Sequence, residues 1–181
     1  MTVMPRDHEW TVADLANTPD DGLRYELVDG VLLVSAAPSN VHQIVLGELN
    51  ELLRAACPAD ARVMFAPTDY QPTQRRSLQP DLLVARRADV GAEPISAPLL
   101  LAVEVLSPST RSVDLLLKRG VYAESGVAAY WVVDPLEPSI QAWTLVDGEW
   151  VDAGRALGGE VLALELPFPV RVQPSQLLDQ D

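Results

Sequence analysis

Two stretches of the chain are almost entirely apolar, and each carries a single acidic residue. The stretch Leu99–Ser107 contains Glu104, and the stretch Gln79–Ala85 contains Asp81 directly after Pro80. Runs of this kind are typical of strands that are buried on both faces of a sheet, and the proline confines Asp81 to a strand start or a bulge. A buried carboxylate is costly without a cation or several hydrogen-bond donors. We therefore expect both acids to have partners inside the protein.

Helical spacing of apolar residues predicts two helices. The first begins at Asn40, with Gln43 completing a cap, and ends before Pro58. The second runs from about Arg111 to Glu124, with Gly126 placed to end it. Its predicted core-facing residues are Val113, Leu116, Leu117, Gly120 and Val121, and beside them Asp114, Lys118 and Tyr122 share another side of the same helix.

Further strands are predicted on either side of these elements. The apolar runs 62–66 and 129–135 read as strands, and the polar stretch 67–77 reads as a loop. Asp29-Gly30 and Asp147-Gly148 each lie between two short apolar runs, which predicts a β-hairpin at both places. The predicted order is helix, three strands, helix, strand over about residues 40–135, with a hairpin over 23–35 and a β extension over 139–172. We expect one α/β domain spanning residues 1–181.

The composition of the chain limits where in the cell the protein is expected and which kinds of partner it can bind. The chain has 181 residues and one cysteine, Cys57, which excludes an internal disulfide and a cysteine-based zinc site. No apolar run approaches the roughly 20 residues that span a bilayer, and no secretory signal is visible, so we expect a soluble cytoplasmic protein without a membrane partner. The net charge of −13 argues at first sight against nucleic acid, because phosphate binding draws on lysine and arginine.

The candidate chemistry is that of two acids on neighbouring strands. Magnesium needs only one or two carboxylates beside water and substrate phosphate, so Asp81 and Glu104 suffice for a metal site. The alternative is structural, with Asp81 in a turn and Glu104 paired to an arginine. His42, in the first turn of a helix, is expected to face solvent, with a general-base role as the less favoured option. Glu26 is expected to be an exposed cross-strand charge.

Several motifs occur together in a fixed order between Tyr25 and Pro135. They are Tyr25-Glu26-Leu27-Val28-Asp29-Gly30, Pro80-Asp81, Glu104-Val105-Leu106-Ser107-Pro108-Ser109-Thr110, Asp114, Lys118, Tyr122, Gly126-Val127 and Tyr130-Trp131-Val132-Val133-Asp134-Pro135. In this combination the chain resembles the Uma-type family of bacterial endonucleases, within the PD-(D/E)XK superfamily. The resemblance implies a restriction-endonuclease-like α/β core, in which a central mixed sheet is flanked by helices.

The resemblance also implies an activity and a site. A metal-dependent endonuclease would use Asp81 and Glu104 to hold Mg²⁺ (or Mn²⁺) and would hydrolyse phosphodiester bonds of nucleic acid, with DNA as the expected substrate. The superfamily places a lysine two positions after the glutamate, where this chain has Leu106. Lys118, the only lysine, is the expected replacement. The superfamily's site usually includes a further acid from an earlier part of the chain. Glu26 is the candidate for this upstream acid, with Glu48 as the second choice.

Two other functions stay open at this point. The absence of a lysine at position 106 and the excess of acidic residues are compatible with a binding module that has the nuclease fold but no catalytic activity. A structural or oligomerising protein is the other alternative, in which the outer hairpin that carries Trp143 and Trp150 pairs with a second copy. We expect a homodimer, which is equally compatible with a nuclease that cuts two strands.

Overall fold

The computed structural model describes residues 2–4, 9–108 and 111–178, and its central element is a six-stranded mixed sheet. The strand order is β11-β10-β9-β8-β7-β4, and only β8 and β9 run parallel. The bounds are β4 (Ala61–Phe65), β7 (Leu82–Arg86), β8 (Leu101–Val105), β9 (Ala129–Asp134), β10 (Ser139–Val146) and β11 (Glu149–Leu157). The strand that contains Glu104 therefore lies near the middle of the sheet, as its apolar sequence predicts.

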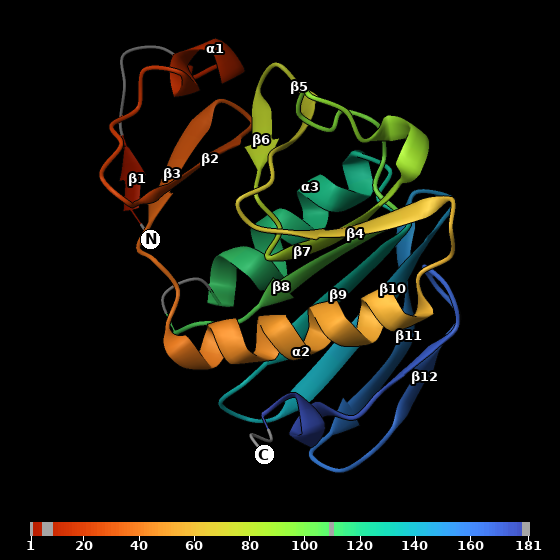
Figure 1. Ribbon diagram of the computed structural model, residues 1–181. Helices are drawn as coiled ribbons and strands as arrows, with labels where there is room; N and C mark the ends of the chain where they lie inside the picture. The colour runs from red at the N-terminus through yellow and green to blue at the C-terminus, as the bar shows by residue number, and fades with distance from the viewer. Residues whose placement is uncertain (1, 5–8, 109–110, 179–181) are drawn as a thin grey trace.

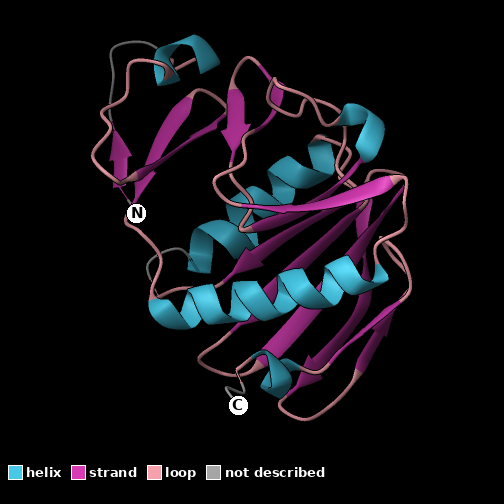
Figure 2. Ribbon diagram, viewed as in Figure 1, coloured by secondary structure: helices cyan, strands magenta, loops and turns pink. Residues whose placement is uncertain are grey.

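Helices cover both faces of this sheet (Figures 1 and 2). The helix α2 (Asn40–Ala56) lies on one face, and the π-helix η2 (Val113–Lys118) continues into α3 (Arg119–Glu124) on the other. Buried side chains alternate between two apolar clusters, so that Leu82, Val84 and Val103 face α2 while Leu83 and Ala102 face α3. This alternation follows from the two-residue period of a strand. The expected central mixed sheet flanked by helices is confirmed.

A second sheet has five strands in the order β1-β3-β2-β6-β5. Its strands are β1 (Thr2–Met4), β2 (Arg24–Val28), β3 (Val31–Ser35), β5 (Tyr70–Thr73) and β6 (Arg76–Leu78), and the short helix α1 (Val12–Leu15) precedes β2. The predicted hairpin around Asp29-Gly30 is confirmed, because both residues have the positive φ that its turn requires. The prediction of a loop over 67–77 is wrong, since β5 and β6 form there and β6 pairs with β2.

The C-terminal region extends the central sheet. The predicted hairpin around Asp147-Gly148 forms β10 and β11, and β10 pairs with β9. Trp143 and Trp150 lie against the ring of Tyr130, with ring centroids 5.8 and 6.0 Å away, so both tryptophans pack on their own chain. The remaining elements are β12 (Leu162–Leu164), β13 (Val170–Val172) and the short helices η1 (Arg87–Asp89) and η3 (Pro174–Leu177). Within the described residues, no helix has the length and apolarity to cross a membrane.

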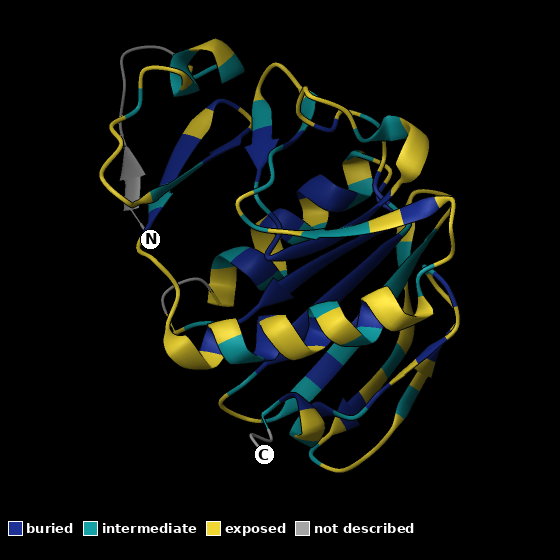
Figure 3. Ribbon diagram, viewed as in Figure 1, coloured by how far each residue is buried: buried dark blue, intermediate teal, exposed yellow. Residues whose placement is uncertain are grey.

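The predicted inner face of the second helix is right for Val121, which is buried, and for Val113, which packs against the apolar core, but wrong for the residues between them. Leu116 and Leu117 are 76% and 41% exposed, whereas Asp114, Lys118 and Tyr122 are buried. Figure 3 shows that this helix has both buried and exposed segments. The physical reason is that Lys118 makes ion pairs with acids of the two sheets, which turns the charged side inward, and π-helical winding departs from the regular 3.6-residue spacing. Such a local departure from α-helical geometry often accompanies a functional site.

This inverted face makes a prediction about stability. Replacing the exposed Leu116 by glutamine should change the free energy of unfolding by no more than about 0.5 kcal/mol. The matched core variant Leu49→Ala, in a side chain of α2 that is completely buried, should lose about 2–5 kcal/mol. Urea denaturation of both variants measures the difference, and a large loss in Leu116→Gln would contradict the observed orientation of the helix.

Candidate active site

Asp81 and Glu104 project from neighbouring strands on the same face of the central sheet. In the antiparallel pair β7 and β8, Leu82 lies opposite Val103, so the next position of the register sets Asp81 opposite Glu104. The backbone N–H of Val105 donates to Asp81 Oδ2 at 2.9 Å, which ties the aspartate to the residue that follows Glu104. Both carboxylates are buried. The structure thus brings together the two acids that the sequence singled out.

Asp81 is held by two further side chains. Arg24 Nη1 donates to Oδ1 at 2.8 Å, and His42 Nε2 lies 3.0 Å from Oδ2. Burial alone would raise the pKa of Asp81, but the hydrogen bond with His42 and the charge of Arg24 lower it to about 2. Asp81 is therefore a carboxylate at any physiological pH.

The expectation that His42 faces solvent is wrong. Its side chain is buried, because the first turn of α2 is directed at Asp81. Ser39 caps this helix by accepting a hydrogen bond from the His42 backbone N–H, so the helix begins at Asn40 as predicted and its capping residue lies one position earlier. No periodicity in the sequence indicates the contact of His42 with Asp81, since the two residues are 39 positions apart.

Glu104 is fixed by an ammonium group and a phenol. Lys118 Nζ lies 3.1 Å from Glu104 Oε1, and the Tyr122 hydroxyl donates to the same oxygen at 2.6 Å. Burial raises the pKa of Glu104 well above its usual value, and Lys118 opposes this shift while Asp114, Asp81 and Glu26 add to it. Burial likewise raises the pKa of Tyr122, so the hydroxyl keeps its proton and serves as a donor.

Lys118 lies among three carboxylates. Its Nζ is 2.9 Å from Glu26, 3.1 Å from Glu104 and 3.6 Å from Asp114. Burial alone would lower the pKa of Lys118, but Glu104, Glu26 and Asp114 together raise it, so the amine is protonated. Lys118 therefore lies beside Glu104, although the position two after Glu104 is the buried Leu106.

The two candidates for the upstream acid have different surroundings. Glu26 is buried, accepts a hydrogen bond from the Gln79 backbone N–H at 2.9 Å and contacts Lys118, which makes the expectation of an exposed cross-strand charge wrong. Glu48 is exposed on α2. Of the two, only Glu26 lies with the other acids.

These groups line one cavity of about 210 Å³, between the second sheet, the start of α2 and the helix η2. Its ionisable lining residues are Arg24, Glu26, His42, Asp81, Glu104, Asp114 and Lys118. Arg24 and His42 were not among the predicted site residues. Arg24 precedes Glu26 by two positions in β2, and the two-residue period of a strand is the one sequence signal that connects it to the site.

Removal of the Lys118 charge should destabilise the protein strongly. Lys118→Met keeps an aliphatic stem but leaves three buried carboxylates without their shared cation, and we expect a loss of about 3–5 kcal/mol at neutral pH. The loss should shrink as the pH falls, because the carboxylates then take up protons. Chemical denaturation across pH measures it, and a loss independent of pH would contradict the electrostatic origin.

Glu104→Gln should have the opposite effect in the absence of metal. A raised pKa in the folded protein means that stability is greatest below the ordinary pKa of glutamate and falls as the pH rises through the raised value. Glutamine resembles the protonated acid, so the variant should gain about 0.5–2 kcal/mol at alkaline pH and nothing at about pH 4. Thermal melts in EDTA test this; a variant less stable than the parent at alkaline pH would contradict it.

The chain is similar in fold to a solved crystal structure. A crystal structure described as "a putative nuclease belonging to DUF820 from Anabaena variabilis ATCC 29413" matches with a TM-score of 0.70 and 16% sequence identity. The match covers 93% of this chain and 97% of that chain. At this identity the likeness shows the fold. A comparison with curated proteins gives no match.

The sequence itself matches a family model over most of its length. The model is that of Uma2, described as "Putative restriction endonuclease", and it matches residues 8–178, which include every ionisable residue of the cavity described above. Residues Ser109 and Thr110, at the end of one of the quoted motifs, lie outside the described residues. The chain belongs to the Uma2 family of restriction-endonuclease-like proteins.

Proposed function

We propose that the protein is a metal-dependent endonuclease that hydrolyses phosphodiester bonds, with DNA as its substrate. The observation that supports this most is the grouping of four buried acids, Glu26, Asp81, Glu104 and Asp114, with one buried ammonium group in a single cavity. Membership of a restriction-endonuclease family supports the same activity. Such a concentration of carboxylates is unfavourable for folding, and sites that bind a cation commonly accept this cost.

The residues of the cavity fit a hard divalent cation. Among the described residues, no three carboxylate, imidazole or thiol groups are arranged to ligate one ion. Magnesium and manganese, however, can be bound by two carboxylates together with water and phosphate oxygens. Asp81 is ionised, and Glu104 Oε2 accepts no hydrogen bond from any described residue, so this oxygen is free for a metal. We assign Asp81 and Glu104 as the ligands. When bound, the ion supplies a water of lowered pKa and neutralises charge on the phosphate.

The other residues of the cavity position these ligands. His42 and the Val105 N–H fix the orientation of Asp81, and Tyr122 fixes that of Glu104. Glu26 and Glu104 together hold the ammonium group of Lys118. Because its pKa is raised, Lys118 acts as a hydrogen-bond donor that orients the attacking water or stabilises negative charge; it does not act as a base.

We also expect a homodimer, since cutting both strands of a duplex needs two sites. Trp143 and Trp150 pack on Tyr130 of their own chain and keep part of their surface exposed. Sedimentation velocity of the full chain with and without DNA tests the oligomeric state.

The activity itself is tested with two conservative variants. Asp81→Asn and Glu104→Gln keep the size of each side chain and remove one ligand charge, and each should slow nicking of plasmid DNA in magnesium or manganese by about 100-fold or more. The matched control is Glu51→Gln, an exposed acid of α2, which should cleave at the parental rate. All four proteins are purified identically, and EDTA should stop the reaction.

Two results would contradict the proposal in different ways. Equal cleavage by parent and both variants would mean that the assigned ligands are wrong. No cleavage by the parent, together with no manganese binding in calorimetry, would favour an inactive binding module.

A further inference from the structure

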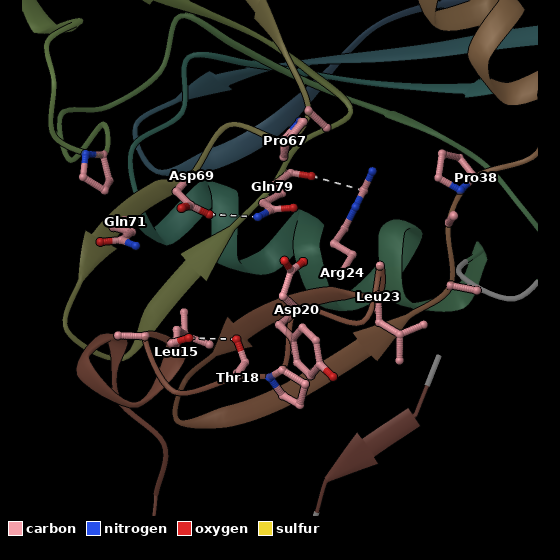
Figure 4. Close-up of a pocket in the computed structure, with 18 of the residues that line it drawn as sticks. Leu15, Thr18, Asp20, Leu23, Arg24, Pro38, Pro67, Asp69, Gln71 and Gln79 are labelled. Carbon is pink, nitrogen blue, oxygen red and sulfur yellow. Dashed lines mark hydrogen bonds between the residues drawn. The ribbon is translucent and has the colours of Figure 1, made fainter.

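A groove of about 840 Å³ lies next to the candidate site, and the two share several lining residues. Arg24 and the segment 36–38 line both spaces, so the groove opens beside the carboxylate cavity. Helix α1, strand β2, the start of α2 and the loop before β5 surround the groove, and Figure 4 shows Arg24 among its lining side chains. A ligand that extends out of the carboxylate cavity can therefore pass along Arg24.

The guanidinium group of Arg24 has one edge occupied and one edge free. Nη1 donates to Asp81 Oδ1 at 2.8 Å and lies 3.4 Å from the Gln79 carbonyl oxygen (Figure 4). The described residues offer no acceptor to Nε or Nη2, and the side chain keeps 18% of its surface exposed. Parallel donation from two nitrogens of an arginine is the favoured geometry for binding a phosphate.

The charges around the two spaces leave few alternatives for binding an anion. Among the described lining residues, Arg24 and Lys118 are the only arginine or lysine side chains. Lys118 is buried and surrounded by Glu26, Glu104 and Asp114, whereas the acids of the larger groove are Asp20, Asp69 and Glu93. Among the described lining residues, Arg24 is therefore the one accessible arginine or lysine that a phosphate entering this acidic surface can meet.

We propose that Arg24 binds a phosphodiester group of the nucleic-acid substrate through Nε and Nη2 while Nη1 keeps its hydrogen bond to Asp81. The side chain thereby links the position of the substrate phosphate to that of a metal ligand. This inference rests on the proposed nuclease function and adds a substrate-binding residue to it.

The test compares Arg24→Gln and Arg24→Lys with the control Arg155→Gln, which removes an exposed charge from the edge strand β11. Binding of a short fluorescein-labelled DNA duplex is followed by anisotropy in EDTA over a range of salt concentrations. Arg24→Gln should weaken binding by about 10- to 100-fold and reduce the slope of log affinity against log salt by about one. Arg155→Gln should bind like the parent.

Arg24→Lys separates charge from geometry. It should keep the salt dependence of the parent, since the charge is present, but should have a lower kcat/KM because an ammonium group cannot donate in parallel from two nitrogens. Manganese affinity, measured by calorimetry without DNA, should be unchanged or higher in Arg24→Gln, because a neighbouring positive charge has been removed.

Three outcomes are distinguishable. Parental binding and salt dependence in Arg24→Gln would overturn the inference, even if the parent cleaves DNA. Loss of manganese affinity together with loss of DNA binding would also overturn it, since Arg24 would then only position Asp81. Absence of cleavage by the parent would remove the proposed nuclease function, whereas the binding measurement in EDTA would still decide whether Arg24 contacts phosphate.

Discussion

The buried ammonium group of Lys118 holds together three carboxylates that would otherwise repel one another. Glu26 comes from the second sheet, Glu104 from the central sheet and Asp114 from the π-helix, so one cation joins three separate parts of the fold. Burial makes each of these charges dependent on the others, because a buried charge is poorly screened by solvent and costly to leave without its partner. The same contact turns the polar side of the helix inward and leaves Leu116 in solvent.

One positive charge divided among three acids leaves the cavity short of cations. Arg24 compensates Asp81 at the opposite side, and the raised pKa of Glu104 shows that its share of Lys118 does not balance the cost of burial. A divalent ion between Asp81 and Glu104 would supply the missing charge, which is why the proposed function treats the metal as part of the electrostatic balance of the site. Without the ion, hydrogen bonds from His42, Tyr122 and the Val105 N–H keep both carboxylates oriented.

The sequence predicted the parts of the fold that depend on local pattern. The buried strands around Asp81 and Glu104, the helix that begins at Asn40 and both Asp-Gly turns follow from alternation, helical spacing and turn chemistry. The strands β5 and β6 were missed because they are short and polar, and β6 is aligned by pairing with β2, which is distant in sequence. The order of elements was thus predictable, whereas the second sheet was only partly so.

The site shows the same division between local and distant signals. Asp81, Glu104 and Lys118 could be named because an acid in an apolar run and a single lysine are conspicuous, and family resemblance pointed to Glu26. The burial of His42 and the contact of Arg24 with Asp81 depend on residues 39 and 57 positions away, which no periodicity reports. The orientation of the helix had a different cause: the hydrophobic pattern favours burying Leu116 and Leu117, but pairing of Lys118 with buried acids outweighs the burial of these two leucines.

An acidic protein that cleaves a polyanion must overcome its own repulsion of the substrate. With a net charge of −13 and acids along the groove, approach of a phosphate is unfavourable until positive charge is available at the point of contact. In the proposed function that charge comes from the metal between Asp81 and Glu104 and from the free edge of Arg24. Metal and nucleic acid then raise each other's affinity, because linkage between two binding events is reciprocal. The acidity that first argued against nucleic acid thereby makes the affinity for nucleic acid higher when the metal is bound than when it is absent.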